Sequence, residues 1–158
     1  MREMRAGELM TPNPITVNAD ASIQEVARAF RTHNIGFLPV VESEQDKTVL
    51  GVITDRDIAV RCTAEGHDPA SCHVRKHMTD ELITARPGDD IRQVMDVMEG
   101  AQIRRLPVVD ERGRAIGVIA QADLAVEAVE EDAVSPLDVA AMLEAISKPA
   151  RPERKGIH

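Results

Sequence analysis

The stretch Gly51-Val-Ile-Thr-Asp-Arg-Asp57 decides the fold, because a close copy of it, Gly117-Val-Ile-Ala-Gln-Ala-Asp123, occurs later in the chain. In each copy an apolar run typical of a buried strand passes directly into polar residues that can begin a helix. Self-similarity of this kind predicts that the chain consists of two structural repeats.

Further matches surround this stretch and keep a constant offset and order. They are Met10-Thr11 with Met78-Thr79, Ile15-Thr16 with Ile83-Thr84, Ile23 with Ile91, Val26 with Val94, Ile35 with Ile103, and Leu38-Pro-Val-Val41 with Leu106-Pro-Val-Val109. The single gap falls in a polar loop, where insertions are tolerated. The sequence therefore predicts a first repeat at 8–63, a linker at 64–75, a second repeat at 76–130, a C-terminal helix at 136–147 and a disordered tail at 148–158.

Each repeat has the pattern β-α-β-β-α. Short first strands are expected near residues 15–17 and 82–85. The first helix follows a capping box in both copies, Ser22 with Glu25 and Asp90 with Gln93. In the first repeat it would place Ile23, Val26, Ala27 and Phe30 on one face. Strands are expected at 37–41 and 49–53, and second helices near 56–63 and 122–130. The last helix would bury Val139, Met142, Leu143 and Ile146.

Composition limits the function classes that remain open. Hydrophobic residues make up 43% of the 158, and the formal net charge of −8 argues against general nucleic-acid binding. No apolar run is long enough to span a bilayer, so no membrane role is expected. Two cysteines without a secretion signal indicate a reduced, cytoplasmic protein. The only aromatic residues are Phe30 and Phe37, so a bound base would lie between aliphatic side chains.

The strand-to-helix junction at residues 51–57 can bind a ribose or a phosphate. Thr54 offers a hydroxyl at the strand end, and the Asp57 carboxylate can accept hydrogen bonds from two neighbouring hydroxyls of a ribose. Ordinary helix capping by Thr54 and Asp57 explains the same residues equally well. Both interpretations stay open on this stretch alone.

The paired Leu-Pro-Val-Val strands, followed by Gly-Val-Ile-Thr-x-x-Asp and Gly-Val-Ile-Ala-x-x-Asp, resemble CBS repeats over roughly residues 8–130. More narrowly, the segments HNIGFLPVV, GVITDRDIAVR and IRRLPVV resemble small stand-alone bacterial two-CBS proteins of the hypoxic-response type. The resemblance implies an α+β fold in which the two repeats pack through their sheets into one pseudo-two-fold Bateman module. It also implies clefts between the repeats that bind AMP, ADP, ATP, NAD or S-adenosylmethionine.

The resemblance assigns ligand-binding roles residue by residue. Asp57 and Asp123 would hold ribose hydroxyls, Thr54 would lie near the ribose or phosphate, and the remaining cleft residues would be Thr16, Ile35, Gly36, Phe37, Pro39, Thr84, Ile103 and Pro107. The two sites differ in sequence. Ala120 replaces Thr54, and Arg104-Arg105 replaces Gly36-Phe37. A basic pair at this position suits phosphate, because arginine donates charge-assisted hydrogen bonds to phosphate oxygens. Arg56 could bind phosphate or pair with Asp55.

A second cluster has the residue types of a metal site. Cys62, His67, Cys72, His73 and His77 lie close together in the sequence, and thiolate and imidazole are zinc ligands. Their spacing matches no standard zinc motif, so we assign no metal ligand and expect no required cofactor. A metal or redox sensor built on this cluster remains an alternative function.

No nucleophile motif or catalytic triad is visible, so the sequence predicts a binding module and not an enzyme. We expect a regulatory homodimer that binds an adenosine-containing ligand and signals to an effector protein by a conformational or oligomeric change. The other alternative is a ligand-free interaction module in which Asp57 and Asp123 only cap helices.

Overall fold

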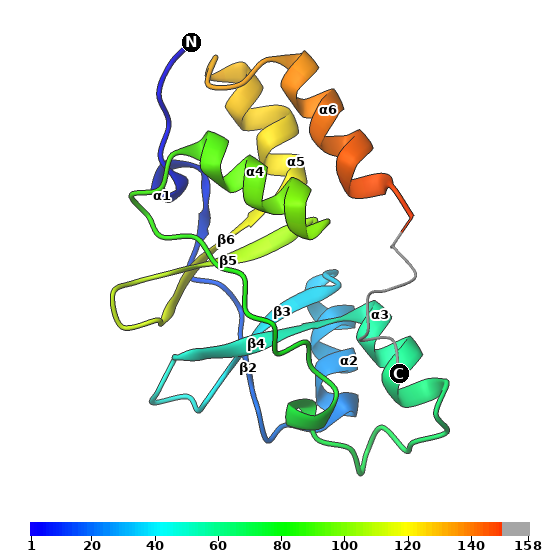
Figure 1. The fold of residues 1–158 in the computed structure, drawn as a ribbon. Helices are drawn as coiled ribbons and strands as arrows, with labels where there is room; N and C mark the ends of the chain where they lie inside the picture. The colour runs from blue at the N-terminus through cyan, green and yellow to red at the C-terminus, as the bar shows by residue number, and fades with distance from the viewer. Residues whose placement is uncertain (150–158) are drawn as a thin grey trace. The chain divides into compact units, whose positions relative to one another are not determined.

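Two compact units make up the chain, each built around one repeat (Figure 1). The computed structural model describes residues 1–149. The first-repeat unit contains Ile15–Leu82 and Arg112–Ala115, and the second-repeat unit contains Met1–Pro14, Ile83–Glu111 and residues 116–149. Helices and strands alternate in both units, which confirms the predicted α+β class. Of the tail predicted to be disordered, residues 150–158 lie outside the described part of the chain.

The first-repeat unit holds a sheet of order β2-β3-β4. Strand β2 lies parallel to β3, and β3 lies antiparallel to β4 with Leu38 opposite Ile53. The elements in chain order are β2 (Val17–Asn18), α2 (Ile23–His33), β3 (Phe37–Val41), β4 (Val49–Thr54), α3 (Asp55–Asp57), η1 (Ile58–Thr63) and η2 (Val74–Lys76).

The second-repeat unit holds a sheet of order β1-β6-β5. Its N-terminal strand β1 comes from the start of the chain and pairs antiparallel with β6. The elements in chain order are α1 (Ala6–Leu9), β1 (Thr11–Pro12), α4 (Ile91–Ala101), β5 (Arg105–Val109), β6 (Ala115–Ala120), α5 (Gln121–Asp123), η3 (Leu124–Ala128) and α6 (Pro136–Ser147).

Each sheet is extended by a segment from the start of the other repeat. Thr79 bridges Val52 of β4, with backbone hydrogen bonds of 2.8 and 3.0 Å in the two directions. In the same way Thr11 of β1 lies opposite Val118 of β6. The matching Met-Thr pairs found in the sequence therefore occupy the same place on the two sheets.

The first strand of each repeat is shorter than predicted. Strand β2 begins only at Val17, and the second repeat has a single bridge between Ala85 and Val108. Ile15 and Leu82 are each 42% exposed, so extending the strand over them would gain little apolar burial.

The capping boxes predicted for α2 and α4 are confirmed. Glu25 N–H donates to Ser22 Oγ at 3.1 Å, and Ser22 N–H donates back to Glu25 Oε2 at 3.0 Å. At the start of α4, Asp90 N–H donates to Gln93 Oε1 at 3.2 Å. Within α2, Ile23, Val26 and Phe30 are buried as predicted, whereas Ala27 is exposed.

The second helix of each repeat is mainly a π-helix. After one short turn of α3, η1 continues with hydrogen bonds such as Ala64 N–H to Ala59 O at 2.9 Å, a five-residue step. In the second repeat, η3 follows α5 in the same way. Sequence periodicity predicted the helices but not this wider form, which is frequent at functional sites.

Each unit has its own hydrophobic core. One core gathers Ala19, Ile23, Val26, Phe30, Leu38, Val40, Ile53, Cys62 and Val74. The other includes N-terminal residues such as Met4 and Leu9 together with Val139, Met142 and Ile146 of α6. Leu143, predicted to share that buried face, is instead 36% exposed. Helix α6 packs on α4, and Gln102 Nε2 donates to Ala145 O at 3.2 Å near the end of α6.

Within the described residues no helix has both the length and the apolar character needed to cross a bilayer.

Helix α6 should contribute to stability through Met142, whose side chain is fully buried. We expect Met142→Ala to lower the free energy of unfolding by about 2–5 kcal/mol, because it removes apolar contacts and leaves a cavity. Leu137 lies on the same helix but is 82% exposed, so Leu137→Ala should change stability by less than about 0.5 kcal/mol. Urea denaturation of both variants checks this, and equal losses would show that α6 does not dock as described.

Candidate functional site

The junction between β4 and α3 is held by a reciprocal pair of hydrogen bonds. Thr54 is extended, and its Oγ1 accepts from Asp57 N–H at 3.1 Å. The Asp57 carboxylate turns back, so that Oδ2 accepts from Thr54 N–H at 3.0 Å. The Thr-x-x-Asp spacing produces this capping box, since the helix start otherwise leaves backbone N–H groups without partners.

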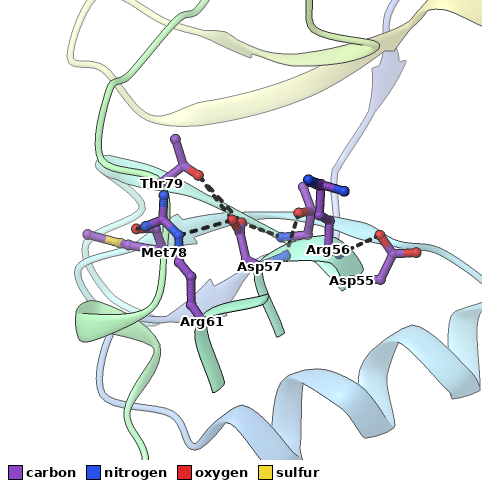
Figure 2. A network of polar contacts seen from close by, with 7 residues as sticks. Asp55, Arg56, Asp57, Arg61, Met78 and Thr79 are labelled. Atoms are coloured by element: carbon purple, nitrogen blue, oxygen red, sulfur yellow. Dashed lines mark hydrogen bonds and ion pairs between the residues drawn. The ribbon is translucent and has the colours of Figure 1, made fainter. Parts of the chain in front are cut away.

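Asp57 has further partners beyond the cap (Figure 2). Its side chain is buried, and Thr79 Oγ1 donates to Oδ1 at 3.3 Å. Arg61 Nε lies 3.6 Å from Oδ1, while another nitrogen of the same guanidinium donates to Met78 O at 3.0 Å. Asp57 thus connects the junction to the Met78-Thr79 segment on the edge of the same sheet.

The junction in the second repeat is simpler. Ala120 N–H donates to Asp123 Oδ2 at 2.8 Å, but Ala120 has no hydroxyl to return the contact. Asp123 is half-buried, and no other hydrogen bond or ion pair to its carboxylate occurs within residues 1–149. One carboxylate oxygen therefore remains available to a ligand, unlike the engaged carboxylate of Asp57.

The residues that precede β3 and β5, Gly36 and Arg104, each lie against the strand-to-helix junction of their own repeat. Asp55 N–H donates to Gly36 O at 3.0 Å, and Gln121 N–H donates to Arg104 O at 2.8 Å. A Cβ at position 36 would come within 2.7 Å of Asp55 Oδ2. The first repeat therefore has a carboxylate beside the strand entry, where the second repeat carries the arginine side chain.

Cysteine and histidine side chains converge at the end of η1. Cys62 Sγ, Cys72 Sγ and a ring nitrogen of His77 all lie within 4.8 Å of one another. His67 Nδ1 lies 3.2 Å from His77 Nε2, and His77 Nδ1 lies 2.9 Å from His73 O. His73 contributes its backbone carbonyl, and its exposed side chain is not among these groups. Both thiols are free, and burial raises the pKa of Cys62, with a further contribution from the neighbouring Cys72.

Two copies of the CBS domain match the chain, at residues 6–62 and 74–130. The chain belongs to the CBS-domain family. The CBS domain-containing protein YhcV of Bacillus subtilis is 38% identical over 125 residues, covering 79% of this chain and 86% of YhcV.

Solved CBS structures agree with this assignment. Hypoxic Response Protein I, crystallised with two coordinated zinc ions, is 29% identical with a TM-score of 0.71, covering 78% of this chain and 98% of that one. The CBS domain pair of MJ0100, in complex with 5-methylthioadenosine and S-adenosyl-L-methionine, is 28% identical with a TM-score of 0.72, covering 82% and 99%. The predicted resemblance to two-CBS proteins of the hypoxic-response type is confirmed.

Hydrogen bonds bring together only some of the predicted ligand residues. In the first repeat they connect Thr54 with Asp57, and they tie Gly36 to the helix start that carries the exposed Arg56. In the second, the backbone carbonyl of Arg104 and the carboxylate of Asp123 both meet the start of α5, and Arg105 opens β5 as an exposed residue.

The other predicted residues make no side-chain hydrogen bond within residues 1–149. Among the apolar ones, Ile35 is 36% exposed, Ile103 and Phe37 are half-buried, and Pro39 and Pro107 are buried in β3 and β5. Thr16 and Thr84 are half-buried just before the first strand of each repeat.

Sequence reasoning missed Thr79 and Arg61 as partners of Asp57. The signal for Thr79 was present, because the Met-Thr pair is among the repeat matches. Its contact with Asp57 depends on the antiparallel bridge to Val52, which no local pattern reveals.

The two thiols should differ in reactivity in metal-free protein. Burial raises the pKa of Cys62 and covers its sulfur, whereas Cys72 is half-buried. Since the thiolate is the nucleophile, iodoacetamide should modify Cys72 at least about tenfold faster than Cys62 at neutral pH. Peptide mapping by mass spectrometry measures both rates, and the difference should vanish in urea. Equal rates in the folded protein would contradict the described burial.

Proposed function

We propose that this chain is a regulatory module that binds an adenosine-containing ligand, such as AMP, ADP, ATP, NAD or S-adenosylmethionine, and has no catalytic step of its own. The observation that carries the proposal is the carboxylate at each strand-to-helix junction, Asp57 and Asp123, in a chain of the CBS family. The complex of the MJ0100 domain pair with adenosine derivatives supports this ligand class.

Ribose recognition follows from the carboxylate chemistry. An ionised carboxylate has about four acceptor positions, and each junction uses one of them for the backbone N–H of the last strand residue. At Asp123 the second oxygen is available for a ribose hydroxyl. At Asp57 a ribose would share the carboxylate with Thr79 and Arg61. Aliphatic side chains near the strand entries, Ile35 and Ile103, would contact the adenine.

Phosphate recognition should differ between the repeats. Arg104 and Arg105 are exposed and form no ion pair within residues 1–149, so their donors can reach a phosphate. In the first repeat the Asp55 carboxylate lies beside Gly36 and would repel an anion. We therefore assign the phosphate of a nucleotide to the second repeat, with Arg104 as its principal contact.

Signalling would act through the segment that contacts Asp57. A ligand that donates hydrogen bonds to the Asp57 carboxylate competes with Thr79, and so favours a different placement of Met78-Thr79. A ligand can shift this equilibrium only by its difference in affinity for the two arrangements. The output would be a contact with an effector protein or a change in a homodimer of a cytoplasmic chain.

Thermal shifts with the named ligands test the proposal. A ligand at about 100 times its Kd stabilises the fold by about 2.7 kcal/mol, which raises Tm by several degrees. We expect at least one ligand to do so in the wild type, and Asp123→Asn to lose the part of the shift that comes from the second junction while keeping an acceptor for Ala120 N–H.

A matched control is available in α6, where Asp138 forms the same capping box with Ser135 and belongs to neither junction. Asp138→Asn should keep the full ligand shift. No shift with any ligand in folded wild-type protein would reject the proposal and favour a ligand-free interaction module.

A further inference from the structure

Four potential zinc ligands recur at every fifth position of the first-repeat unit: Cys62, His67, Cys72 and His77. Cys62 is the buried residue of η1, His67 and Cys72 lie in the loop that follows, and His77 caps η2. The loop folds back on itself, so that Cys72 and His77 lie close to Cys62 although they are far from it along the chain. The spacing matches no common motif, which is why the sequence alone did not identify a site.

The distances suit one tetrahedral ion. Zinc binds imidazole nitrogen at about 2.0–2.1 Å, so two nitrogens on one tetrahedral ion are about 3.3 Å apart. His67 Nδ1 and His77 Nε2 are 3.2 Å apart. The two sulfurs and a ring nitrogen of His77 lie within 4.8 Å of one another, and the exposed His67, which lies outside this group of three, would join them by a side-chain movement.

The tautomer of His77 is set by the contact that its Nδ1 makes. Nδ1 lies 2.9 Å from the carbonyl oxygen of His73, which can only accept, so Nδ1 carries the proton. In neutral imidazole Nε2 then keeps the lone pair that can bind a metal, and His67 Nδ1 lies 3.2 Å from it. A backbone carbonyl that orients a histidine in this way is the usual outer partner of a metal-bound imidazole.

The loop has little apolar burial to fix it. From Thr63 to His73 no residue is buried, and only Pro69 and Cys72 are half-buried. Hydrophobic burial therefore contributes little to holding this loop, although backbone hydrogen bonds such as His67 N–H to Cys62 O, at 3.0 Å, already shape it. A bound ion would join His67 and Cys72 of the loop to the buried residues Cys62 and His77.

We propose that Cys62, His67, Cys72 and His77 form a closed structural zinc site that fixes the loop after the first CBS repeat. Two sulfur and two nitrogen ligands in tetrahedral arrangement select zinc, and four protein ligands leave no open position for catalysis. On binding, each thiol loses its proton to solvent and becomes a thiolate ligand, and no electron is transferred.

Cobalt substitution tests the ligand set in the full-length wild type. Co²⁺ added to reduced, metal-free protein should give the strong visible bands of tetrahedral coordination and a thiolate-to-cobalt charge-transfer band in the near ultraviolet. One equivalent of Zn²⁺ should abolish both. A weak octahedral spectrum without charge transfer would overturn the proposal, and this readout needs no variant to fold.

Variants with matched controls test the individual ligands, with zinc content and competition against a chromogenic chelator as readouts. Cys72→Ser and His67→Ala should each weaken zinc binding by more than about tenfold. His73→Ala keeps the carbonyl that orients His77 and should bind zinc as the wild type does. Wild-type affinity in Cys72→Ser or His67→Ala would overturn the four-ligand site, as would an equal loss in His73→Ala.

Discussion

In both units the structure depends on a short segment from the start of one repeat, which extends the sheet of the other repeat. Thr79 hydrogen-bonds to Val52 in both directions, and the Thr79 carbonyl lies so close to Gly51 that a Cβ there would collide with it. The glycine of the Gly-Val-Ile motif is therefore needed for strand contact. This bridge also brings Thr79 to Asp57 and ends the loop that returns from Cys62 to His77.

The two repeats share the same strand-to-helix junction, but the side chain beside it is acidic in the first repeat and basic in the second. In both repeats an aspartate carboxylate turns back and accepts from the backbone N–H of the last strand residue. In the first repeat the Asp55 carboxylate lies next to Gly36. In the second repeat Arg104 stands at the position that corresponds to Gly36. In a chain of net charge −8, local placement of arginine decides where an anion can bind. An internal repeat can thus keep its fold while the charges beside its two junctions differ.

Much of this fold could be predicted from the sequence, because it rests on local rules. The capping boxes at Ser22 and Asp90 and the strand-to-helix turn at Asp57 follow from residue spacing over a single helical turn. Non-local features could not be predicted. The two-residue β2, the π-helical form of η1, the Thr79–Asp57 contact and the meeting of Cys62 with His77 all depend on how distant segments pack.

Calorimetric titration of the wild type with AMP and with adenosine, repeated on Arg104→Ala, tests most directly whether the second repeat binds a nucleotide phosphate. AMP should bind at least about tenfold more tightly than adenosine, because charge-assisted hydrogen bonds to the phosphate contribute about 1.5–3 kcal/mol. Arg104→Ala should bring the two affinities close together. Equal affinities in the wild type, or no binding of either compound, would contradict the assignment of a nucleotide phosphate to the second repeat.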